Sequence, residues 1–242
     1  MNDPDEKLAA LIAELDDLDK RRIRAAVDAL VPLATGSSEL RESLNALLNH
    51  PQRRNRWPIA YLLGSLPEPS AEVLEVLVET LGSPDSDIRW AVLLLLVRSG
   101  KTDARIVNLL LDLLETGDAT QRRMAIYCIR DLRLQDEIAI PVFLKRLNDS
   151  EPMVRVASAT SLKLRPNLNS NDKDLLLKVF LNDPDSRVRS AAAVILAGLG
   201  PASEEFLTAL RRAAESESTQ IKKAAGAALA LLEKKRSAPA GR

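Results

Sequence analysis

The stretch "NDPDSRVRS", residues 182–190, joins a turn to the start of a helix. Asparagine, aspartate and proline favour turns, and they lead directly into an arginine flanked by small and β-branched residues. Close variants recur as "GSPDSDIRW" from Gly82, "NDSEPMVRV" from Asn148 and "NHPQRRNRW" from Asn49. One turn-and-helix unit therefore recurs several times along the chain.

The spacing of these units predicts a repeat architecture. Successive copies of the basic residue are separated by 32, 33, 33, 33, 34 and 33 positions, and a regular period of this length is typical of stacked helical repeats. The aligned residues are Arg24, Arg56, Arg89, Arg122, Arg155, Arg189 and Lys222. We predict a single domain over residues 1–233 and a flexible tail over 234–242. The predicted repeats are 3–35, 36–67, 68–100, 101–133, 134–167, 168–200 and 201–233.

Each copy is predicted to contain two helices. In the second helix at 184–199, Val188, Ala192 and Ile195 follow the spacing of one helical face. The earlier segments 71–81 and 103–114 are apolar at the same period. We interpret the residues six positions before the arginines as N-caps, with Pro84 and Pro184 in the first helical position. This predicted cap column is Ser83, Thr116, Asp149, Asp183 and Ser216.

Two segments carry a family resemblance. "LNDPDSRVRSAAAVILAGLG" (181–200) resembles the second half of a HEAT repeat of the PBS-lyase type, and "EIAIPVFLKRLNDSEPMVRVASA" (137–159) resembles a whole motif. The resemblance implies an all-α fold, a right-handed α-solenoid of about seven stacked helical hairpins. It also implies a structural ladder between turn aspartates and helix arginines. The matching residues are Asp149, Arg155, Asp183 and Arg189.

The composition fits a soluble protein without an internal disulfide framework. Of 242 residues, 46% are hydrophobic, and 34 basic residues balance 34 acidic ones. This zero net charge argues against a protein whose main task is to coat nucleic acid. The single cysteine, Cys128, fits a reducing compartment, and the longest apolar run, at 91–97, is too short to span a bilayer. We predict a cytoplasmic protein that does not enter membranes.

One face of the second helices carries all the tryptophans and tyrosines. On a helical wheel, the column directly after the arginine and the column four residues later point away from the apolar face. The tryptophans fall in the first column and the tyrosines in the second, in three consecutive copies. The predicted partner-binding residues of this face are Trp57, Tyr61, Trp90, Leu94, Arg123, Tyr127 and Arg130. The alternative is that these aromatic rings fill a satellite core between neighbouring helices.

Function is predicted to lie in this stripe, because the repeated turns are structural. We predict a non-catalytic scaffold that binds a segment of another protein or a peptide on the concave face of repeats two to four. A segment with acidic residues on either side of its apolar anchors would suit the arginines of this face. No cofactor or metal is expected: His50 is the only histidine, and no glycine-rich phosphate loop is present.

Two enzyme alternatives stay open through the resemblance. HEAT-like alkylpurine DNA glycosylases cup DNA with tryptophan, arginine and an aspartate, and other nucleic-acid binders would also use such residues. Here the positions four residues after the tryptophans hold Tyr61 and Leu94, and Asp28 is the only carboxylate near that face. A bilin lyase-type role in chromophore handling is the second alternative, carried by the repeat type alone.

Overall fold

The chain is helical throughout the part that the structure describes. The computed structural model describes residues 4–50, 55–165, 167–198 and 204–237, which form fourteen α-helices and no strand. Contacts within the chain divide it into two compact units, Met1–Cys128 and Ile129–Arg242. No helix among the described residues has both the length and the apolar character needed to cross a bilayer.

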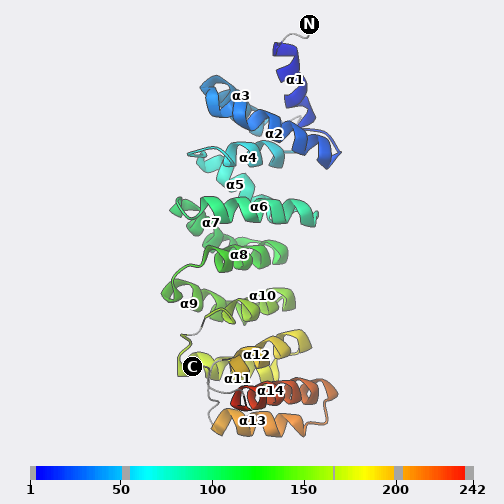
Figure 1. The fold of residues 1–242 in the computed structure, drawn as a ribbon, viewed down its shortest axis with the longest axis vertical. Helices are drawn as coiled ribbons and strands as arrows, with labels where there is room; N and C mark the ends of the chain where they lie inside the picture. Colours follow the sequence, from blue (N-terminus) through cyan, green and yellow to red (C-terminus); the bar gives the residue numbers. More distant parts are fainter. Residues whose placement is uncertain (1–3, 51–54, 166, 199–203, 238–242) are drawn as a thin grey trace. The chain divides into compact units, whose positions relative to one another are not determined.

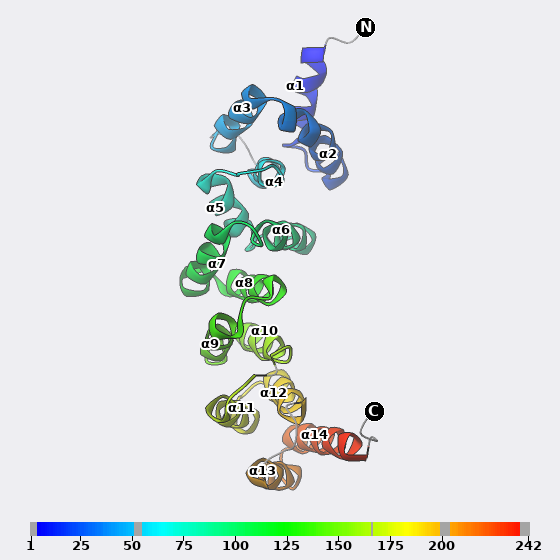
Figure 2. The same ribbon diagram turned by 60° about the vertical axis from the view of Figure 1, so that its left-hand side comes forward.

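The first unit is built from helical hairpins whose helices alternate between two rows (Figures 1 and 2). The hairpins α1–α2, α3–α4 and α5–α6 each pack internally, and α2, α4 and α6 pack in succession along one row. Helix α8 begins in this unit and continues past its boundary. The bounds are α1 (Pro4–Glu14), α2 (Lys20–Gly36), α3 (Ser38–Leu48), α4 (Trp57–Gly64), α5 (Ala71–Thr80), α6 (Ser86–Ser99), α7 (Ala104–Thr116) and α8 (Ala119–Leu132).

The second unit repeats the same plan. The hairpins α9–α10, α11–α12 and α13–α14 pack internally, and α10, α12 and α14 contact one another in succession. Figure 2 shows α9, α11 and α13 on one side of this unit and their partner helices on the other. The bounds are α9 (Asp136–Arg146), α10 (Pro152–Leu162), α11 (Ser170–Asn182), α12 (Ser186–Gly198), α13 (Glu204–Ala214) and α14 (Thr219–Ser237).

Each unit has its core between the two rows of helices. In the second unit Phe143 and Phe180, from first helices of their hairpins, are fully buried, and so is Val188 from the apolar face of α12. Val92 and Leu96 of α6 are fully buried in the first unit. A single hairpin has no opposing apolar face of its own, so its helices are stabilised by burial against the neighbouring hairpins.

The predicted N-cap column is wrong by a few residues. Helix α6 begins at Ser86, and its N-cap is Asp85, whose carboxylate accepts from the amides of Asp87 and Ile88. Ser83 lies earlier, in the turn, and accepts from the Asp85 amide. The other predicted caps accept likewise from the amide two residues later, or end a helix, as Thr116 does. Short polar side chains close tight turns in this way as readily as they cap helices. For this reason the prediction placed the helix starts a few residues too early.

The prolines and the tail also differ from expectation. Pro84 and Pro184 lie in the turns, before the helices start at Ser86 and Ser186, where their missing N–H also costs nothing. Helix α14 runs to Ser237 and so includes the first four residues of the predicted tail, 234–237. The residues there, "KKRS", include good helix formers whose positive charge is favourable at a helix C-terminus. Residues 238–242 lie outside the described part of the chain.

Candidate functional site

The candidate binding surface lies on α6 and α8 in the first unit. The rings of Trp90 and Tyr127 stack with centroids 5.8 Å apart and planes 12° from parallel. Leu94 lies one turn after Trp90 on α6, and residues four apart share a helix face. Trp90 is 43% exposed and Leu94 is 66% exposed, whereas Tyr127 is half-buried. We call Trp90, Leu94 and Tyr127 the aromatic surface.

This stacking ties two neighbouring repeats together through two columns of the same helix face. Trp90 occupies the column directly after the arginine of its copy, and Tyr127 occupies the column four residues later in the next copy. A stacked aromatic pair is worth about 0.5–1.5 kcal/mol beyond the burial of its area. The stack therefore holds the indole ring in a fixed orientation while leaving much of its surface open to solvent.

Trp57 and Tyr61 are placed differently from their counterparts. Both lie on α4, which packs against α6, and both are half-buried. Neither ring joins an aromatic stack within the residues that the structure describes. Helix α4 has eight residues against fourteen in α6, and Arg56 at its N-cap position makes no side-chain cap.

The two predicted arginines have different surroundings. Arg123 stands one turn before Tyr127 on the same face of α8, and its buried Nε atom has no hydrogen-bond partner among the described residues. Arg130 belongs to the second unit, where its Nε and Nη2 atoms donate to the Asp131 carboxylate at 2.7 and 3.0 Å. Arg123 thus places its guanidinium beside the aromatic surface, whereas Arg130 pairs with Asp131, its neighbour in sequence.

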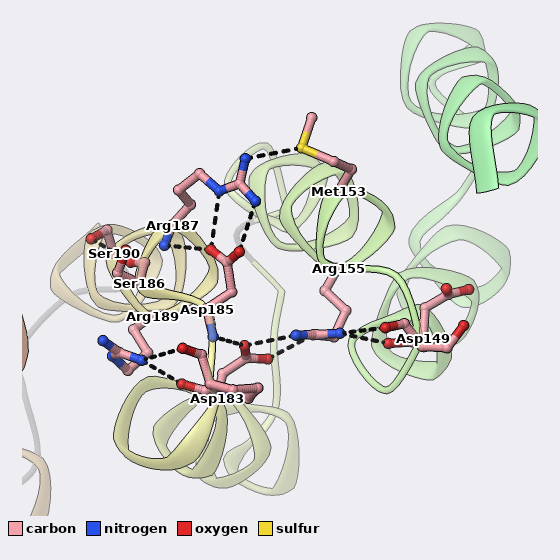
Figure 3. Close-up of polar contacts among 11 residues, drawn as sticks. Asp149, Met153, Arg155, Asp183, Asp185, Ser186, Arg187, Arg189 and Ser190 are labelled. Carbon is pink, nitrogen blue, oxygen red and sulfur yellow. Dashed lines mark hydrogen bonds and ion pairs between the residues drawn. The ribbon is translucent and has the colours of Figure 1, made fainter.

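The predicted ladder residues come together in the second unit (Figure 3). Arg155 donates from Nε and Nη2 to the two carboxylate oxygens of Asp183, at 2.8 and 3.0 Å. Its Nη1 atom donates to the carbonyl of Asp149, in the turn before its own helix, at 2.9 Å. One guanidinium therefore joins its own turn to the turn of the following repeat.

The same bond from the arginine to its own turn recurs along the chain. Arg189 donates to the carbonyls of Asp183 and Pro184, and Arg122 donates to the carbonyl of Gly117. Arg24 differs: its side chain is 85% exposed and faces Asp28 on its own helix at 3.9 Å. The first copy thus departs from the pattern because its arginine points into solvent rather than into a turn.

A second acid–arginine pair beside the ladder was missed in the sequence. Arg187 donates hydrogen bonds from Nε and Nη2 to the carboxylate of Asp185, and the Arg187 amide donates to the same carboxylate (Figure 3). Arg105 and Asp103 repeat this arrangement at the start of α7. The sequence signal was the pattern "D-x-R" at the start of α7 and of α12, with the aspartate directly before the first helical residue. Asp85, Asp118 and Asp185 also form a column four residues before the recurring arginines of their repeats, where the capping carboxylates lie.

The stability of the second unit should fall in acid because of Asp185. The hydrogen bonds from the Arg187 side chain lower the pKa of this carboxyl from 3.8 to about 2. A depressed folded-state pKa gives stability that is complete above the ordinary value and is lost as the pH falls from about 4 toward 2. An NMR titration of the side-chain carbon of Asp185 should show a midpoint near 2, and a midpoint near 3.8 would contradict this. The Arg187→Ala variant should move the midpoint up.

The described residues offer no cluster for a metal. No group of three or more histidine, cysteine, aspartate or glutamate side chains is placed to hold an ion in that part of the chain. Cys128 is fully buried, in an apolar column of α8, where a thiol is shielded from reaction. The arrangement of the aromatic surface suits contact with another molecule and provides no acid–base pair.

Comparison with known proteins identifies the repeats. A family model described as HEAT repeats matches residues 8–97 and 107–197, which is three-quarters of the chain. No curated protein sequence matches the chain significantly.

Among solved structures, the YibA protein of E. coli is 16% identical with a TM-score of 0.57, over 96% of this chain and 93% of that one. This similarity shows the fold alone. A designed armadillo repeat protein in complex with the peptide (KR)4 is 16% identical with a TM-score of 0.43, over 93% and 99%. Human deoxyhypusine hydroxylase in complex with glycerol is 17% identical with a TM-score of 0.43, over 94% and 84%. Scores this low carry no argument about function. The fourteen described helices, the repeated turn-to-arginine bonds and the family match lead to one conclusion: the chain belongs to the HEAT-repeat family.

Proposed function

We propose that this HEAT-repeat chain is a non-catalytic scaffold that binds a segment of another protein on the aromatic surface of α6 and α8. The observation that carries the proposal is the Trp90–Tyr127 stack beside the exposed Leu94. The stack orients an indole ring that is nevertheless 43% exposed. The half-buried Trp57 and Tyr61 of α4 are proposed to extend this surface toward the preceding hairpin.

The energetic argument concerns apolar area left in water. Burying one large apolar side chain is worth about 1.5–3 kcal/mol, so the exposed parts of Trp90 and Leu94 forgo a substantial part of that stabilisation. Exposed apolar side chains that lie together mark interaction sites more often than scattered ones do. Tryptophan, tyrosine and arginine are also the types that dominate binding energy at protein interfaces.

Arg123 supports a partner with a carboxylate next to its apolar anchor. Arg123 stands one turn before Tyr127 on the same face of α8, so its guanidinium is placed to border the aromatic surface. A carboxylate is the natural acceptor for a guanidinium, because the two can form paired hydrogen bonds. We therefore propose a segment with an aromatic or branched apolar anchor flanked by aspartate or glutamate.

The aromatic surface could instead bind single-stranded nucleic acid, and the test must distinguish that alternative from peptide binding. Aromatic rings stack on bases, and the chain has no net charge to attract phosphates. Nucleic-acid affinity falls steeply with salt, whereas binding dominated by an apolar anchor changes little. The salt dependence of binding therefore distinguishes the two.

The test is a peptide array with tryptophan, leucine or phenylalanine anchors and either acidic or basic flanks. Acid-flanked members should bind, and the Trp90→Ala/Leu94→Ala variant should weaken that binding by at least about 30-fold, the loss typical of removing a hot spot. Leu164→Ala is the matched control, because Leu164 is 65% exposed but lies in the second unit. Equal binding by the double variant, or preference for an oligonucleotide with steep salt dependence, would overturn the proposal.

A further inference from the structure

A cavity of about 270 Å³ lies in the first unit, away from the aromatic surface. It is bounded by α3, by the end of α4, by the segment joining α4 to α5, and by the first turn of α5. Its apolar wall is formed by Leu63, Leu66 and Val73, all of them buried. Pockets for drug-sized ligands usually measure about 300–1,000 Å³, so this volume, just below that range, limits the cavity to a smaller molecule. The polar side chains that line it are Ser38, Arg41, Glu42, Asn45, Glu68 and Ser70.

Charged side chains of both signs line this cavity. The Nε atom of Arg41 is buried and has no hydrogen-bond partner among the described residues. Glu42 and Glu68 are exposed, and Glu68 interacts electrostatically with Arg105. The neighbouring Arg105 differs, since it holds Asp103 through two nitrogens and donates to the Pro69 carbonyl at 2.9 Å. The Nε atoms of Arg89 and Arg123 are in the same state, so the Arg41 donor supports a site only through the cavity that Arg41 lines.

The backbone at Glu68 is held in an unfavourable conformation. Its φ angle is +54°, in the left-handed region that glycine adopts freely and other residues seldom do. Prolines at 67 and 69 fix the chain on both sides. Backbone strain of this kind persists where the surrounding structure enforces it and is concentrated at functional sites. The residue in this conformation at the edge of the cavity is a glutamate, although glycine would adopt the same backbone angle without strain.

We propose that this cavity binds a small zwitterion with an apolar side chain, either a free α-amino acid or a dipeptide. The ligand carboxylate accepts hydrogen bonds from Arg41, and its ammonium group lies between the carboxylates of Glu42 and Glu68. Its side chain packs against Leu63, Leu66 and Val73. A ligand with one charge of each sign satisfies the cavity better than an anion or a cation alone, because the lining itself carries both signs.

This site is independent of the proposed scaffold surface. Its residues come from α3, the end of α4, the segment between α4 and α5, and the start of α5, whereas the aromatic surface lies on α6 and α8. A failure of peptide binding at Trp90 would leave the cavity proposal intact, and the reverse also holds. Occupancy of the cavity would give the chain a small-molecule ligand in addition to a protein partner.

The experiment measures the arginine Nε–Hε signals by NMR while L-leucine or the dipeptide leucyl-leucine is added to the full chain. The Arg41 signal, assigned by its loss in Arg41→Gln, should shift and saturate with one of the two probes. Which probe binds more tightly tells the free amino acid from the dipeptide. N-acetyl-L-leucine lacks the ammonium group and L-leucinamide lacks the carboxylate, so each should bind at least tenfold more weakly than L-leucine.

Glu68→Gly separates binding from folding. Glycine relieves the positive φ, so this variant should melt at a higher temperature than the wild type while binding the probe at least tenfold more weakly. Glu75→Gln on the exposed face of α5 is the matched control and should bind normally. The proposal is overturned if neither probe moves the Arg41 signal at millimolar concentration. Equal binding of N-acetyl-L-leucine, or unchanged binding by Glu68→Gly, overturns it as well.

Discussion

Replacing Arg155 with alanine should lower the free energy of unfolding of the second unit by about 3–5 kcal/mol, the usual cost of removing one partner from a buried ion pair. The side chain of Arg155 is 9% exposed and that of Asp183 is 6% exposed. The substitution removes the two guanidinium hydrogen bonds to the Asp183 carboxylate. It also removes the hydrogen bond from Nη1 to the carbonyl of Asp149. A charge that stays buried and unpaired accounts for most of the expected loss.

The measurement is chemical denaturation combined with hydrogen exchange, because repeat proteins can unfold in parts. Amides of α10 and α12 should lose protection first, since the bond joins their two turns. Arg187→Ala is the control. Its side chain is 58% exposed, and an exposed pair of this kind is worth about 0–1 kcal/mol. A wild-type melting curve for Arg155→Ala would show that the ladder contributes nothing to stability.

Replacing Phe143 with alanine should cost about 3–5 kcal/mol, the range for emptying a buried aromatic site. The ring is fully buried in α9, and the guanidinium carbon of Arg165 lies 5.9 Å from its centroid. Arg165 is itself buried and bonded to the Leu134 carbonyl and the Asp136 carboxylate. The variant therefore loses both apolar burial and the aromatic face beneath a buried cation.

A thermal melt followed by circular dichroism should place the variant about 10 °C below the wild type, given the size of the chain. Phe143→Leu retains most of the buried volume and should lose less than half as much. Ser158 donates to the Phe143 carbonyl, and this backbone contact survives in both variants. If leucine and alanine destabilise the protein equally, packing volume is not what the phenylalanine contributes.

The repeat architecture could be predicted from local sequence. The 33-residue period, the apolar faces of the helices and the family resemblance all predicted paired helices, and the fourteen described helices and the HEAT match agree. Helical periodicity is encoded within about two turns, so it does not depend on distant residues. The position of the helix starts was harder. Asp85 and Ser83 are both competent caps, and only the turn geometry decides between them.

The site depended on contacts between repeats. Trp57 and Trp90 occupy the same sequence column, yet Trp57 is half-buried and Trp90 is exposed and stacked on Tyr127. Likewise, Arg155 takes its carboxylate from Asp183, 28 residues away, and its carbonyl partners from its own turn. The cavity beside Arg41 left no mark in the sequence, because its walls come from two separate segments, 38–45 and 63–73. The sequence determined the helices and their repeat because these follow from neighbours along the chain. Exposure, pairing and the cavity were decided only by the tertiary structure, because they depend on residues brought together from different repeats.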